Sequence, residues 1–221
     1  MNIQFKMLED MKYFVFDFDG TLINSIPVWE KVHGMVFENY NIPYLEKQHL
    51  DNIQGLSTPD CSKFIITKYN LTASVEEVKD IFISNCIKLF QQVEFINNGD
   101  NFLRMLIEKK IPVGLATACP HAVIESFLSR YPDIRQNITI VTCEDVGASK
   151  PSPKVFLECM RQIGGNPQET VVFEDTVAGM QGARASGGRV IGILSERNQM
   201  DQKREICDFL VDDYTELLKE L

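Results

Sequence analysis

Short apolar runs alternate with amphipathic segments along most of the chain. Runs rich in Val, Ile and Phe predict buried strands at residues 13–18, 112–117, 138–142, 170–174 and 189–194, with a weaker sixth at 209–211. Apolar and polar residues alternate only weakly within each run, which is typical of parallel strands that are covered on both faces. Helical spacing predicts helices at residues 101–109, 121–129, 153 onward (after Ser152 as N-cap) and 177–185. Strands alternating with helices predict an α/β fold with a doubly wound parallel sheet.

One long stretch breaks this alternation. Residues 27–93 contain helical patterns and no convincing strand, with Trp29, Val32 and Val36 among the periodic positions. We therefore expect two domains: an α/β core of residues 1–25 and 95–221, and an all-helical insertion of residues 26–94. An insertion that follows the first strand would lie over the carboxyl ends of the strands, where open parallel sheets bind ligands.

Composition and charge exclude several classes of protein. The chain has 221 residues, of which 44% are hydrophobic and 24% charged, and its formal net charge is −9. Such an acidic protein repels nucleic acid and anionic membranes, so we expect neither as a partner. The six cysteines form no CxxC pair, and we see neither a signal peptide nor an apolar run long enough to span a membrane. We expect a monomeric cytoplasmic protein with reduced thiols.

The residues at the ends of the predicted strands have a consistent chemistry. In order along the chain they are Asp17 and Asp19, Thr117 with Ala118 and Cys119, Lys150 just beyond the third strand, and Glu174 with Asp175. Because the carboxyl ends of parallel strands share one edge of the sheet, we expect these side chains to converge.

So many carboxylates at one point would repel one another without a cation. Asp17, Asp19, Glu174 and Asp175 offer only oxygen ligands, which suit Mg²⁺. Magnesium seldom sits in an all-protein cage, so this site should also accept phosphate oxygens. Lys150 and the Thr117 hydroxyl could bind the remaining oxygens of a phosphoryl group.

The order of these motifs resembles that of a known family. The segments DFDGT at 17–21, Thr117, KPSP at 150–153 and FED at 173–175 resemble the four motifs of the haloacid dehalogenase superfamily. The helical insertion is similar to the family's first type of cap domain. The chain looks most like the β-phosphoglucomutase-like branch of phosphatases and mutases, and the resemblance covers nearly its whole length.

The resemblance implies a role for each matching residue. Asp17 would be the nucleophile and a metal ligand, and Asp19 the general acid and base, with its backbone carbonyl on the metal. Thr117, Ala118 and Lys150 would bind the phosphoryl group. Glu174 and Asp175 would complete the magnesium site. The expected function is a magnesium-dependent phosphatase that hydrolyses a small phosphorylated metabolite, either a sugar, a polyol or a nucleoside monophosphate, through an aspartyl-phosphate.

Two alternatives stay open on the sequence alone. One is a phosphomutase, although Trp29 stands where similar mutases carry a histidine, and Thr58 follows the Gly-x-Ser element in place of their arginine. The other is a non-catalytic phosphate-binding module, although no motif carboxylate is replaced. The candidates for substrate contacts in the insertion are Trp29, His33, Gln54 and Gly55.

Overall fold

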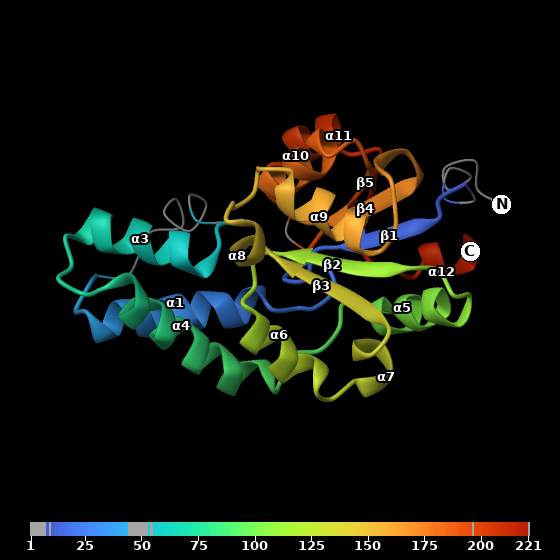
Figure 1. Ribbon diagram of the computed structural model, residues 1–221. Helices are drawn as coiled ribbons and strands as arrows, with labels where there is room; N and C mark the ends of the chain where they lie inside the picture. The colour runs from blue at the N-terminus through green and yellow to red at the C-terminus, as the bar shows by residue number, and fades with distance from the viewer. Residues whose placement is uncertain (1–7, 9, 44–52, 54, 196, 221) are drawn as a thin grey trace.

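The computed structural model describes residues 8, 10–43, 53, 55–195 and 197–220, and a parallel sheet forms its centre (Figure 1). The strands are β1 (Tyr13–Phe16), β2 (Val113–Thr117), β3 (Ile138–Thr142), β4 (Thr170–Glu174), β5 (Arg189–Ile193) and β6 (Phe209–Val211). Their order is β3-β2-β1-β4-β5-β6, and every neighbouring pair is parallel. The expectation of a doubly wound parallel α/β sheet is confirmed.

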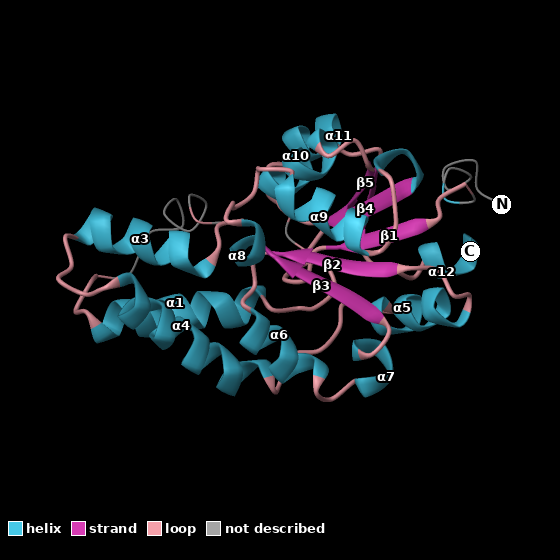
Figure 2. Ribbon diagram, in the orientation of Figure 1, coloured by secondary structure: helices cyan, strands magenta, loops and turns pink. Residues whose placement is uncertain are grey.

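Helices cover both faces of the sheet and also extend beyond one end of it, as Figure 2 shows by colour. They are α1 (Ile26–Asn39), α3 (Thr58–Tyr69), α4 (Val75–Phe90), α5 (Gly99–Glu108), α6 (His121–Leu128), α7 (Pro132–Arg135), α8 (Cys143–Val146), α9 (Lys154–Gln162), α10 (Val177–Ala185), α11 (Met200–Ile206) and α12 (Leu217–Glu220), with a 3-10 turn at Pro167–Glu169. Among the described residues, no helix combines the length and the apolar character needed to cross a membrane.

Alternate side chains of the strands enter two separate cores. Phe14 and Phe16 of β1 pack on one face together with α5, α6 and α12. Val15 points to the other face and packs with residues of α9 and α10, including Phe156 and Met180. Because both faces are buried, these strands read as continuous apolar runs in the sequence.

Several predicted boundaries need correction by one or two residues. The first strand ends at Phe16 and not at residue 18, because the chain turns there and Leu22 N–H donates to the carbonyl of Phe18 at 3.0 Å. The helix expected from Pro153 begins at Lys154, so that Pro153 itself is the N-cap and Ser152 lies one position further out. These shifts leave every predicted element in place.

The region between β1 and α5 contains the helices α1, α3 and α4 and no strand among its described residues. In Figure 1 these helices extend away from the sheet, on the side that the arrowheads of β2 and β3 face. The two segments that connect this helical region to the sheet lie side by side. Asn24 N–H donates to the carbonyl of Glu94 at 2.9 Å, and Ile23 forms an antiparallel bridge with Phe95. The helices therefore lie over the carboxyl ends of the strands.

Candidate active site

The first strand delivers two aspartates to the edge of the sheet. Asp17 is only 5% exposed, and its N–H continues the ladder by donating to the carbonyl of Phe173 at 2.9 Å. Gly20 then turns the chain with a φ of +71°, a conformation that glycine adopts without strain. A Cβ at Gly20 would lie 2.2 Å from Oδ2 of Asp175. This glycine therefore allows the first and fourth strand ends to meet.

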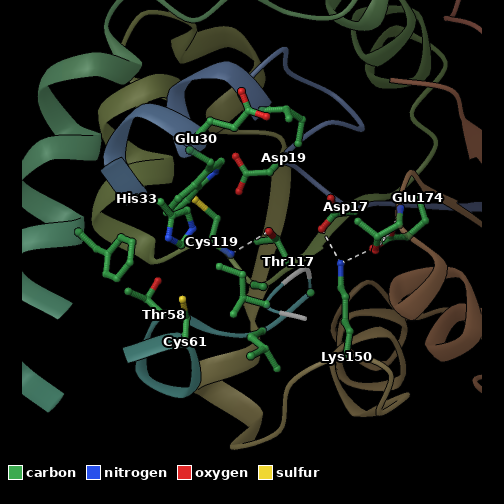
Figure 3. Close-up of a pocket in the computed structure, with 18 residues that line it drawn as sticks. Asp17, Asp19, Glu30, His33, Thr58, Cys61, Thr117, Cys119, Lys150 and Glu174 are labelled. Atoms are coloured by element: carbon green, nitrogen blue, oxygen red, sulfur yellow. Dashed lines mark hydrogen bonds and ion pairs between the residues drawn. The ribbon is translucent and has the colours of Figure 1, made fainter. Parts of the chain in front are cut away.

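Lys150 lies at the centre of the site and is 3% exposed. Its ammonium is 2.5 Å from Oδ1 of Asp17 and 2.5 Å from Oε1 of Glu174, and Figure 3 shows both ion pairs. Burial acts to lower the pKa of Lys150, but the two carboxylates outweigh burial and hold the pKa above its usual value. Lys150 is therefore a fixed positive charge in this pocket.

The carboxylate of Glu174 is held at both oxygens. Oε2 accepts hydrogen bonds from the N–H groups of Asp175 and Thr176, each at 2.8 Å, and from the Thr176 hydroxyl at 3.0 Å. Oε1 contacts Lys150. A Cβ at Gly179 would lie 1.8 Å from Oε1, so α10 can begin here only with a glycine at that position. Glu174 thus fixes the position of the lysine.

Asp175 is 4% exposed and is held by two hydroxyl groups. Thr21 Oγ1 donates to its Oδ1 at 3.1 Å, and Ser195 Oγ donates to its Oδ2 at 2.9 Å. Sequence analysis did not select Ser195, although it follows β5 and the rule that selected the other strand ends would have found it.

Three of these carboxylates could share a cation. Asp17, Glu174 and Asp175 each offer an oxygen, and these oxygens lie within 4.8 Å of one another. Burial raises the pKa of Asp17 to about 7, and burial with the charges of Glu174 and Asp17 raises the pKa of Asp175 well above its usual value. A divalent cation at this point would relieve that repulsion, and an all-oxygen donor set fits Mg²⁺.

Thr117 ends β2 beside the two aspartates and is 1% exposed. Its Oγ1 accepts a hydrogen bond from Cys119 N–H at 3.0 Å, which orients the side chain and leaves the hydroxyl hydrogen available for a ligand. Burial raises the pKa of the Cys119 thiol well above its usual value, so this cysteine is not an activated nucleophile.

These residues line one pocket between the sheet edge and the inserted helices (Figure 3). The predicted residues that the pocket brings together are Asp17, Asp19, Trp29, His33, Gly55, Thr117, Ala118, Lys150 and Glu174. Asp175 does not line the pocket, but one of its carboxylate oxygens lies within 4.8 Å of an oxygen of Asp17 and of an oxygen of Glu174. Gln54 lies outside the described residues.

Sequence analysis missed several residues of the insertion that line the pocket. They are Ile26, Glu30, Ile53, Leu56, Thr58, Cys61 and Phe82. Positions 26, 29, 30 and 33 form one stripe along α1, so the helical spacing from Trp29 and His33 could have indicated Glu30. His121 does not line this pocket, and its Nε2 lies 2.9 Å from Oδ2 of Asp145.

The chain is similar in sequence to two named phosphatases and in fold to a hydrolase of known structure. Hexitol phosphatase B of Escherichia coli (strain K12) is 27% identical over 206 residues, covering 92% of each chain. The phosphorylated carbohydrates phosphatase of Thermotoga maritima is 26% identical over 190 residues, covering 85% of this chain and 88% of that protein. The crystal structure of a hydrolase from Pseudomonas syringae superposes with a TM-score of 0.82 at 22% identity, covering 95% of this chain and 97% of the other.

The family comparison covers most of the chain, including the sheet edge and the inserted helices. The sequence profile of the haloacid dehalogenase-like hydrolases matches residues 14–193. That range includes all four strand ends that form the pocket, from Asp17 to Asp175. The protein therefore belongs to the family of haloacid dehalogenase-like hydrolases.

Proposed function

We propose that this protein is a magnesium-dependent phosphatase that hydrolyses a small phosphorylated metabolite through an aspartyl-phosphate on Asp17. The observation that carries the proposal is the contact of Lys150 with both Asp17 and Glu174, which joins three distant segments in one buried site. The substrate would be a phosphate of a sugar, a polyol or a nucleoside. The names of the two sequence relatives, which refer to hexitols and phosphorylated carbohydrates, favour the first two.

Asp17 and Asp175, with the backbone carbonyl of Asp19, would hold the magnesium ion. When bound, the ion would offset the charge of the carboxylates and of the phosphoryl oxygens. Glu174 belongs to the same acidic cluster. Because its Oε2 is bonded to three donors and its Oε1 contacts Lys150, we assign it chiefly to positioning the lysine.

The reaction would proceed in two displacements at phosphorus. In the first, a carboxylate oxygen of Asp17 attacks the phosphorus atom, and the bond from phosphorus to the ester oxygen breaks. Asp19 protonates the departing alkoxide. In the second, Asp19 removes a proton from water as the water attacks the aspartyl-phosphate, and inorganic phosphate leaves with Asp17 restored.

The surroundings of Asp19 support its role as the acid. Burial raises the pKa of its carboxyl group, which favours the protonated form that proton donation requires. Its Oδ1 is buried without a hydrogen-bond partner among the described residues. Lys150 and the Thr117 hydroxyl would bind the phosphoryl oxygens while this proton is transferred.

We also propose that the chain divides into a catalytic core of residues 1–25 and 95–221 and a helical cap of residues 26–94. The paired connections at Asn24–Glu94 and Ile23–Phe95 support this division, because both crossings lie at one point. A cap on such a hinge could close over the substrate and exclude water from the pocket.

The proposal is tested with p-nitrophenyl phosphate, with and without magnesium. We expect turnover that depends on Mg²⁺, is lost with EDTA and returns when the metal is restored. Asp17→Asn should abolish turnover while its circular dichroism spectrum shows that the fold is retained; its melting temperature should fall, because Lys150 loses one of its two carboxylate partners. Activity of that variant near the wild-type level would refute the assignment of the nucleophile. An assay of glucose-phosphate isomerisation separates a phosphomutase from a phosphatase.

A further inference from the structure

The pocket has an unusual distribution of charge. Its described lining contains the carboxylates of Asp17, Asp19, Glu30 and Glu174, and a single ammonium, Lys150. Three of the carboxylates belong to the sheet edge, where the proposed chemistry uses them. Glu30 does not: it lies on α1, in the inserted helices. Figure 3 shows Glu30 and Lys150 at opposite sides of the drawn site.

Lys150 is already committed to the sheet edge. Its ammonium contacts Asp17 and Glu174 at 2.5 Å each, and it is 3% exposed. A phosphoryl group that binds beside Asp17 would take the remaining capacity of this ammonium. In the described lining, no second Lys or Arg is left for another anionic group of the substrate.

His33 supplies no second positive charge. It lies among the rings of Trp29, Phe37 and Phe82, with ring centroids at 6.3, 6.4 and 4.9 Å. Burial lowers the pKa of His33 to about 4, so the imidazole is neutral near pH 7 and offers one donor and one acceptor. The part of the pocket formed by the inserted helices is thus negative at Glu30 and otherwise uncharged in the residues that the structure describes.

We propose that Glu30 is a specificity-determining residue, which restricts the pocket to phosphate monoesters whose leaving group is uncharged and carries hydroxyl groups. The inference rests on the proposed phosphatase function. A hydroxyl of the leaving group can donate to the Glu30 carboxylate, and hydrogen bonds to an ionised acceptor are among the stronger ones. A carboxylate or second phosphate at the same place would face Glu30 without a counter-charge.

The remaining surface of the pocket suits such a leaving group. Trp29, Leu56 and Phe82 provide apolar walls for the C–H groups of a sugar or polyol, and the hydroxyl of Thr58 adds a polar contact. The cavity volume is about 170 Å³. At the roughly 30 Å³ that one water molecule occupies in the liquid, that space accommodates on the order of six water-sized groups, which matches a phosphoryl group with a short polyol fragment better than a nucleotide.

The test compares two esters that differ at one terminus. D-glucitol 6-phosphate ends in a neutral CH2OH group, and 6-phosphogluconate ends in a carboxylate on a chain of the same length. We expect kcat/KM of the wild type to favour the glucitol ester by at least about tenfold, the effect of one uncompensated charge at short range. Inhibition constants against p-nitrophenyl phosphate give the same comparison for an ester that is bound but not hydrolysed.

Substitution of Glu30 should then change the preference. Glu30→Lys should reduce the ratio of kcat/KM for D-glucitol 6-phosphate to kcat/KM for 6-phosphogluconate at least about tenfold, mainly by lowering KM for 6-phosphogluconate. Glu30→Gln should reduce this ratio by a smaller factor. Glu38→Lys is the matched control: it makes the same change of charge at a position of α1 that is exposed, as Glu30 is, but that lies two helical turns from Glu30 and does not line the pocket. It should leave the ratio within about twofold, because solvent screens distant surface charges.

The possible outcomes separate this inference from the proposed function. Equal kcat/KM values and equal inhibition constants for the two esters, with p-nitrophenyl phosphate still hydrolysed, would overturn the role of Glu30 and leave the phosphatase assignment intact. An equal effect of Glu38→Lys and Glu30→Lys would show that net charge, and not Glu30, decides the preference. No hydrolysis of any of the three esters in the presence of Mg²⁺ would contradict the proposed function itself, and this inference with it.

Discussion

The ammonium of Lys150 lies 2.5 Å from Oδ1 of Asp17, although the two residues are 133 positions apart in the chain. The pair is buried, and the carboxylate of Glu174, from a third segment of the chain, also contacts the ammonium. Removing one partner of such a buried group leaves an uncompensated charge, which costs several kcal/mol. The fold therefore holds these charges together before a substrate arrives, as electrostatic catalysis requires.

Asp175 should control the affinity for magnesium. We expect Asp175→Asn to raise the Mg²⁺ concentration for half-maximal activity at least about tenfold, because its carboxylate belongs to the acidic cluster. Magnesium titration of the initial rate measures this change. Glu144→Gln removes a charge from an exposed residue just after β3, outside that cluster, and should leave the titration unchanged. An unaltered titration for Asp175→Asn would remove this residue from the metal site.

Gly20 should be intolerant of a side chain for two reasons. Gly20→Ala would place Cβ 2.2 Å from Oδ2 of Asp175 and would require alanine at a φ of +71°. We expect a loss of about 2–4 kcal/mol in the free energy of unfolding and a further loss of magnesium affinity. Urea unfolding and the metal titration measure the two effects.

Gly147 provides the control for this substitution. It has a similar φ of +61°, but a Cβ there would meet nothing within 4 Å. Gly147→Ala should therefore cost about 1 kcal/mol from backbone strain alone and should leave the metal titration unchanged. Equal stability and equal activity of the two variants would show that the contact with Asp175 does not constrain the site.

Ser149 connects the inserted helices to the segment that carries Lys150. Its Oγ accepts from Ser57 N–H at 2.9 Å and donates to Asp60 Oδ2 at 2.5 Å. Ser149→Ala should leave the Ser57 N–H unsatisfied and loosen the attachment of α3 to the segment that carries Lys150, raising KM by about three- to tenfold. Lys63→Ala removes only the exposed partner of Asp60 and should have little effect. A KM equal to that of the wild type in Ser149→Ala would contradict this linkage.

His33 should make stability depend on pH in mildly acidic solution. Burial lowers its pKa from 6.5 to about 4 in the folded protein, so the unfolded chain binds a proton that the folded protein excludes. The free energy of unfolding should fall as the pH drops from about 6.5 to about 4, by at most about 3 kcal/mol, and less because the residue is half-buried. In His33→Gln, urea unfolding at several pH values should show this dependence reduced. An unchanged pH profile would mean that other groups cause it.

The sequence predicted the strands and the residues at their ends because both carry local signals. The runs around Val15, Val113 and Val172 are apolar since each strand is buried on both faces, and the motif residues follow directly. The convergence of Asp17, Lys150 and Glu174 was predictable from the rule that parallel strands end at one edge.

The part of the pocket that the inserted helices form could be predicted from the sequence only to a small extent. Glu30 and Thr58 lie on helices whose orientation depends on packing between α1, α3 and α4, and no local pattern encodes that packing. Glu30 is an exposed residue of α1, and nothing in the sequence distinguishes it from other exposed helix residues. The second hydroxyl on Asp175, from Ser195, was missed because it comes from a fifth strand end outside the motifs.

The central claim is that Asp17 carries the phosphoryl group during turnover, and a chemical trap tests it most directly. The enzyme is mixed with Mg²⁺ and a rapidly hydrolysed phosphate ester, quenched in acid within one turnover, and digested for mass spectrometry. We predict one phosphoryl group on the peptide that contains Asp17, and none in Asp17→Asn. Steady turnover with no phosphorylated peptide, or with the phosphoryl group on another residue, would contradict the account.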